Sequence, residues 1–187
     1  MPSRLAVASL IAGLVFMAMP AHTASPAYVL SASEIASLRT QVGKATSIVG
    51  WGESSAALKR VFQHVTGKHG GLYTGKPRSA LEVFWEHSRG PPDEIELRDG
   101  RYISGGACMM WACHYNKTAY LVDTVTGHVA MAFTHWHDVE GQELPYSGLA
   151  IFTKSCASAE FKAYAYRYFD AWARRSNASV TTLTTRC

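Results

Sequence analysis

The sequence lacks the motifs by which many enzyme classes are recognised. It contains no Gly-x-Ser-x-Gly nucleophile elbow, no glycine-rich phosphate loop and no dinucleotide fingerprint. Charged residues are scarce, at 17% of the chain, and internal repeats and low-complexity tracts are absent. The net charge of +4 is small, and no basic stripe is interleaved with aromatic residues, which argues against nucleic-acid binding. We therefore expect an ordinary globular protein that is not an enzyme.

Long apolar runs are also missing, except at the N-terminus. A positive residue, Arg4, precedes an apolar run from Leu5 to Met19, and small residues follow that run. This pattern is typical of a cleaved signal peptide over residues 1–24, because the run is short for a membrane span. A retained N-terminal anchor is the alternative. We expect an exported protein that is soluble in the bacterial periplasm after cleavage, with residues 28–187 forming a single α+β domain.

Cysteine is rare, and the chain contains only Cys108, Cys113, Cys156 and Cys187. An even number in an exported chain predicts two disulfides, for which three pairings are possible. We favour Cys108–Cys113, which would stabilise the fold by about 2 kcal/mol, and Cys156–Cys187, which would contribute about 4 kcal/mol. The short bridge would mainly hold one loop in shape. A zinc site is the alternative, although one Cys-x4-Cys spacing without a matching second pair is poor evidence for it.

Apolar residues at helical spacing predict three helices in the first half of the chain. The first is short, with Ser33 as its N-cap. The second begins near Ser54 or Ser55 and ends at Gly67, a natural helix stop. The third is a turn or two around Leu81–Trp85.

From Asp93 onward the apolar period changes to two, which predicts strands. The expected strands are Glu94–Arg98, Arg101–Ala107, Thr118–Asp123, His128–Thr134 and Leu149–Thr153. Asp99-Gly100 is a typical two-residue hairpin turn. A last helix, from Ser158 to about Ser176, would cover one face of the sheet, and it carries a stripe of aromatic residues that we interpret as core. The predicted fold is α+β, an antiparallel meander of about five strands covered by helices and stabilised by disulfides.

The segment between the first two cysteines is apolar, with Met109, Met110 and Trp111 in the predicted ring. A ring of this size cannot bury all three side chains beneath itself. Either they pack on a neighbouring helix, or they form an apolar tip that a disulfide holds rigid. A rigid exposed tip would be suited to plug a cleft. Because the disulfide already orders the loop, little conformational entropy would be lost on binding. Both interpretations remain open at this point.

His135 and His137 form a second candidate site. A His-x-His spacing places both imidazoles on one face of a strand, as in some metal sites, and Asp138, Glu140 and Glu143 follow. No distinct third ligand follows from the sequence, and histidines at the end of a strand are commonly just solvated. A metal site is therefore a secondary hypothesis, and we expect no cofactor.

Between Leu58 and Phe133 several short motifs follow one another in a fixed order. It runs through Ile95-x-Leu97-x-x-Gly100-x-Tyr102, Gly106-Ala107-Cys108-x4-Cys113, Ala119-x-Leu121 and a strand from Gly127 to Phe133. This pattern resembles the periplasmic inhibitors of vertebrate lysozyme. In that family a small disulfide loop protrudes from the sheet, and the histidine of its Lys-Pro-His-Asp insert reaches the catalytic carboxylates in the cleft of lysozyme. Here the insert is Met109-Met110-Trp111-Ala112.

The resemblance implies an inhibitor that protects the cell wall by plugging the cleft of lysozyme, or of another cell-wall glycoside hydrolase, with the disulfide loop. Trp111 would be the anchor, with Met109, Met110 and Ala112 around it. His114, just outside the ring, would be a hydrogen-bonding neighbour. Neither the class of lysozyme nor the oligomeric state follows from the sequence.

Two alternative functions remain. One is a periplasmic metal-binding or metal-dependent protein that uses His135 and His137. The other is a periplasmic interaction module with an unrelated partner, which the same apolar loop would serve.

Overall fold

The computed structural model describes residues 26–46, 52–73, 75–137, 146–173 and 179–187. Over these residues, the helices are α1 (Ala32–Arg39), α2 (Gly52–Thr66), α3 (Ala80–His87) and α4 (Ala159–Ala173). The strands are β1 (Gly70–Tyr73), β2 (Lys76–Ser79), β3 (Glu96–Arg98), β4 (Tyr102–Cys108), β5 (Lys117–Asp123), β6 (Val129–His137), β7 (Tyr146–Lys154) and β8 (Ser179–Thr185). The predicted signal peptide lies outside the described residues.

The main sheet has the strand order β3-β4-β5-β6-β7-β8. Strands β3 to β7 form the predicted antiparallel meander, which confirms the α+β class. Two features were not predicted: β1 and β2 form a separate hairpin, and β8 pairs with β7 in parallel. The parallel pairing is possible because α4 crosses over the sheet between the two strands.

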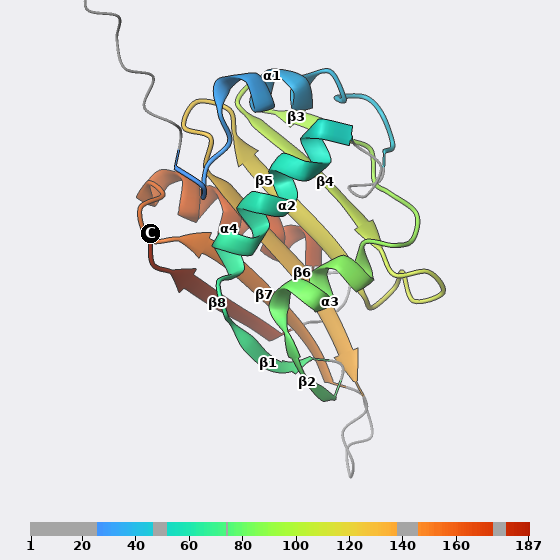
Figure 1. Cartoon of the computed structure of the whole chain (residues 1–187). Coiled ribbons are helices and arrows are strands. Elements are labelled where there is room, and N and C mark those ends of the chain that lie inside the picture. The colour runs from blue at the N-terminus through green and yellow to red at the C-terminus, as the bar shows by residue number, and fades with distance from the viewer. Residues whose placement is uncertain (1–25, 47–51, 74, 138–145, 174–178) are drawn as a thin grey trace, which may run out of the picture.

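Helices cover both faces of this sheet (Figure 1). On one face, α2 and α3 pack over a core that contains Phe62, Phe84 and Tyr120. On the other face, α4 packs over a second core that contains Leu121 and Phe161. Neighbouring residues of β5 thus point into different cores, as the period of two requires. None of the described helices is long and apolar enough to span a membrane.

The helix starts differ from the sequence-based expectation. Ser31, not Ser33, is the N-cap of α1, because its hydroxyl accepts a hydrogen bond from the Glu34 amide at 3.3 Å. The Glu34 carboxylate in turn accepts a bond from the Ser31 amide at 2.7 Å, which completes a capping box. Helix α2 begins at Gly52, earlier than Ser54. It ends, as predicted, before Gly67, which has a φ of +58°.

The predicted turn and both favoured disulfides are confirmed. Asp99 and Gly100 both have positive φ, as the hairpin between β3 and β4 requires. Cys108 pairs with Cys113, and Cys156 pairs with Cys187. Because all four cysteines are bridged, the alternative zinc site built on them is wrong.

His87, at the end of α3, is fully buried and packs edge-on against Phe133. Burial lowers the pKa of His87 to about 4. The nearby Glu86 carboxylate acts in the opposite direction, whereas the positive forms of His135 and Arg78 lower the pKa further. His87 is therefore neutral in the folded protein at any pH well above 4.

The protein is expected to lose stability as the pH falls from about 6.5, where an unfolded histidine titrates, to about 4, where His87 titrates in the fold. The loss is up to about 3 kcal/mol, because the unfolded chain binds a proton that the folded chain excludes. We expect His87→Leu to remove this part of the loss, as measured by urea unfolding at pH 7, 5 and 4. An identical acid-induced loss in both proteins would contradict the assignment.

Candidate functional site

The disulfide loop projects from the sheet where β4 ends and β5 begins (Figure 1). Cys108 and Lys117 form the last register pair of the two strands. Beyond them, the Met109 amide donates to the Asn116 carbonyl at 2.8 Å, and the Ala112 amide donates to the Met109 carbonyl at 3.0 Å. The Asn116 side chain also contacts the Met109 sulfur at 3.7 Å. Backbone hydrogen bonds therefore continue from the strand pair into the loop.

The segment that follows α3 supports the base of the loop. The Gly90 amide donates to the Cys108 carbonyl at 2.8 Å, and the Cys108 amide donates to the Pro91 carbonyl at 3.2 Å. A Cβ atom at position 90 would lie 2.3 Å from the Cys108 carbonyl oxygen, so only glycine permits this approach. On the other side of the loop, the Thr134 hydroxyl donates to the Tyr115 carbonyl at 2.6 Å. The loop is thus attached to the domain on two sides.

The tip of the loop is apolar and exposed. Trp111 is 97% exposed and Met110 is 53% exposed, so the interpretation that Trp111 belongs to the core is wrong. Trp111 also has a φ of +68°, a left-handed conformation that is uncommon for residues other than glycine. Such backbone conformations cluster at binding sites, where the surrounding structure holds them. A fully exposed tryptophan in an unusual conformation is therefore the strongest local indication of function.

The remaining predicted loop residues lie around this tip. Met109 and Ala112 are half-buried, whereas His114 is exposed just outside the ring. The neighbouring Tyr115 is 48% exposed, and its ring centroid lies 6.3 Å from that of His114. We call Met110, Trp111, His114 and Tyr115 the loop surface. Tyr115 was missed from the sequence, because nothing in the local pattern shows that its ring is exposed beside His114.

The predicted histidine pair does not form an exposed site in the part of the chain that is described. His135 is buried, and its ring lies 5.2 Å from that of Tyr73. The side chain of His137 lies outside the described residues, as do Asp138, Glu140 and Glu143. Among the described side chains, no group of three histidines, cysteines or carboxylates could hold a metal ion.

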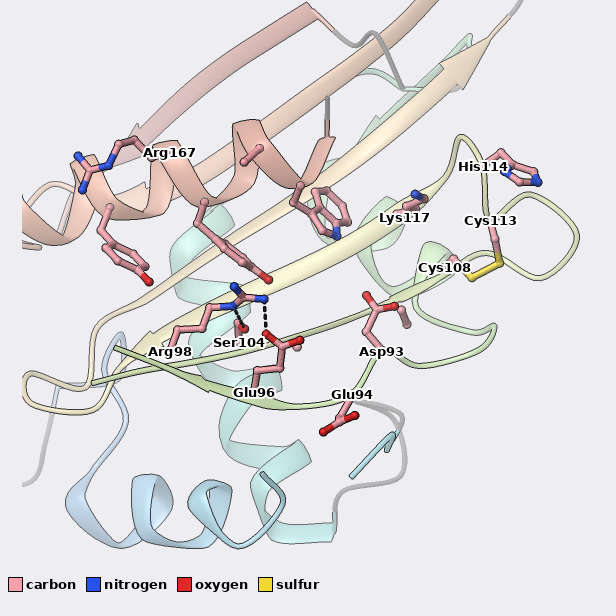
Figure 2. Close-up of a pocket in the computed structure, with 16 residues that line it drawn as sticks. Asp93, Glu94, Glu96, Arg98, Ser104, Cys108, Cys113, His114, Lys117 and Arg167 are labelled. Carbon is pink, nitrogen blue, oxygen red and sulfur yellow. Dashed lines mark hydrogen bonds and ion pairs between the residues drawn. A yellow bond between two sulfur atoms is a disulfide. The ribbon is translucent and has the colours of Figure 1, made fainter. Parts of the chain in front are cut away.

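A groove of about 940 Å³, which we call the α4 groove, lies between α4 and strands β3 to β5 (Figure 2). Its wall includes Tyr164, Tyr168 and Trp172 of the aromatic stripe that was interpreted as core. These side chains are only partly buried, whereas Phe161 and Phe169 of the same helix fill the core. The rotation of α4 about its axis, which the sequence does not determine, packs these three side chains against the rim of that core, where they also line the groove.

Comparison with models of protein families, with curated proteins and with solved structures finds no match for this chain. The resemblance to lysozyme inhibitors therefore stays a hypothesis from the sequence. Experiments that test this hypothesis should therefore change residues of the exposed loop.

Proposed function

We propose that the protein is an exported inhibitor of lysozyme, or of a related cell-wall glycoside hydrolase, that inserts its loop surface into the substrate cleft. The observation that carries this proposal is the 97% exposure of Trp111 at the tip of a disulfide-closed loop. Large aromatic side chains dominate the binding energy of many interfaces once a partner buries them. The two disulfides also fit an oxidising compartment such as the periplasm.

The attachment of the loop supports a plugging role. A disulfide and backbone hydrogen bonds order the loop before binding, so that little conformational entropy is lost on association. The substrate cleft of a glycoside hydrolase contains two carboxyl groups. His114, exposed just outside the ring, would donate a hydrogen bond to one of them while Trp111 fills an apolar subsite. The inhibitor would exclude the glycan without any turnover.

The direct test is a turbidity assay in which chicken-type and goose-type lysozymes lyse bacterial cell walls in the presence of the oxidised protein. We expect one of the two enzymes to be inhibited. The amount of protein that stops lysis should rise in proportion to the concentration of enzyme. If the amount of protein needed rises instead with the amount of cell wall, the protein shields the substrate and does not bind the enzyme. No inhibition of either enzyme would overturn the proposal.

Removal of the short disulfide is expected to weaken inhibition without unfolding the protein. Without the bridge part of the loop's order would be formed only on binding, so Cys108→Ser with Cys113→Ser should raise the inhibition constant, by at most roughly 30-fold if the whole loop-closure free energy of about 2 kcal/mol is lost at that step. Circular dichroism would check that the variant keeps its fold. Unchanged inhibition by the folded variant would show that loop rigidity plays no part.

A further inference from the structure

The α4 groove has a balanced set of charged side chains. Its lining includes the acidic residues Asp93, Glu94 and Glu96 and the basic residues Arg98, Lys117 and Arg167. A strongly charged ligand would meet as much repulsion as attraction in such a site. The lining therefore suits an uncharged ligand whose groups both donate and accept hydrogen bonds.

Arg98 is held in a fixed orientation on the floor of this groove (Figure 2). Its Nε donates to the Ser104 hydroxyl at 2.8 Å, and its guanidinium forms an ion pair with Glu96. The guanidinium also lies over the ring of Tyr168, 4.9 Å from the centroid. Arg98 retains further N–H donors, and the Glu96 carboxylate retains acceptor sites beside them. A fixed donor next to a fixed acceptor matches the adjacent hydroxyls of a sugar ring.

Asp93 supplies a second acceptor. Over the described residues, its carboxylate makes no side-chain hydrogen bond, and it lies above the backbone of Gly106. A Cβ atom at position 106 would lie 2.7 Å from the Asp93 Oδ2, so glycine provides the space for this carboxylate. Burial raises the pKa of Asp93, although Lys117 acts in the opposite direction. The carboxylate is nevertheless accessible to water from the groove.

The wall that α4 contributes is aromatic. Tyr164, Tyr168 and Trp172 follow one another at every fourth residue, which spaces them by about 6 Å along the helix. Tyr164 stacks on Tyr102, with ring centroids 4.0 Å apart, and Arg98 covers Tyr168. Trp172 is half-buried and lines the groove. The indole would present an apolar face to the C–H face of a sugar.

We propose that the α4 groove binds a linear oligosaccharide, with Arg98, Glu96 and Asp93 bonded to its hydroxyls and Trp172 stacked on a ring. The volume of about 940 Å³ is large for a small-molecule site and leaves space for more than one sugar. The groove also extends to His114 and the Cys108–Cys113 bridge, so a bound glycan would lie beside the loop surface. The inference does not depend on which partner the loop binds.

The test is a titration of the isotope-labelled, oxidised protein with β-1,4-linked tetramers of N-acetylglucosamine and of glucose, followed by amide chemical shifts. We expect saturable shifts along β3, β4 and α4 with at least one tetramer. Asp93→Asn should weaken binding roughly tenfold, because a charge-assisted acceptor is lost. Arg98→Lys should weaken it similarly, because it keeps the charge but loses the fork of donors.

Thermal melting would verify that both groove variants remain folded. Val125→Ala is the control, because that side chain is 74% exposed and does not line the groove, and it should bind the tetramer as the parent protein does. We expect the same titration results even if the protein does not inhibit lysozyme, because the groove and the loop would bind different ligands. Absence of shifts with both tetramers at millimolar concentration, or equal binding by the parent and both groove variants, would overturn the proposal.

Discussion

Trp111→Ala is expected to weaken binding to lysozyme by roughly 100-fold while leaving the free energy of unfolding unchanged. The indole contacts almost nothing in the free protein, since it is 97% exposed, so its removal creates no cavity. In the complex it would be buried, and truncation of such an anchor costs about 2–4 kcal/mol. Calorimetric titration and urea unfolding of the same preparations would measure the two quantities.

A matched control is Val125→Ala. Val125 is also apolar and is 74% exposed, but it lies in the turn after β5, at the opposite end of that strand from the disulfide loop. We expect it to change neither binding nor stability. Unfolding of the Trp111→Ala variant, or inhibition equal to that of the parent protein, would contradict the assigned role of Trp111.

Removal of the long disulfide is expected to reduce the free energy of unfolding by about 4 kcal/mol, because the bridge closes a loop with a sequence separation of 31 residues that contains all of α4 and β8. The bridge fastens the edge strand β8 to the end of β7. Urea unfolding of Cys156→Ser with Cys187→Ser would measure the loss.

Two hydrogen bonds near this bridge would remain in that variant. The Ser155 amide donates to the Thr185 carbonyl at 2.8 Å, and the Thr185 hydroxyl donates to the Val65 carbonyl at 2.7 Å. The folded fraction of the variant should still inhibit lysozyme, because the loop surface lies elsewhere. A loss below about 1 kcal/mol would mean that strand pairing and these bonds hold β8 without the bridge.

The parts of the fold that depend on local sequence were predictable. The alternation of apolar residues placed β3 to β7, and Asp99-Gly100 placed the turn between the first two of them. The favoured cysteine pairing was also correct. For the strands and the turn, a short segment contains the necessary information, because side-chain period and turn conformation are local properties.

The parts that depend on distant contacts were not predictable. Strand β8 was missed because its pairing with β7 is parallel and non-local, although the β-branched residues of Ser179–Thr185 favour a strand. The attachment of the disulfide loop depends on Gly90, which follows α3 and approaches the Cys108 carbonyl. The α4 groove depends on how α4 is rotated against the sheet. The α4 groove and the exposure of the loop therefore required three-dimensional information, whereas the loop itself was a candidate from the sequence.

The most direct test of the central claim is a calorimetric titration of the oxidised protein into two forms of the inhibited lysozyme. One form has a free cleft, and the other carries a covalently attached sugar analogue that fills the cleft. We predict one-to-one binding to the free enzyme and no binding to the blocked one, because the loop and the sugar would occupy the same space. Equal binding to both forms, or binding to neither, would contradict insertion of the loop into the cleft.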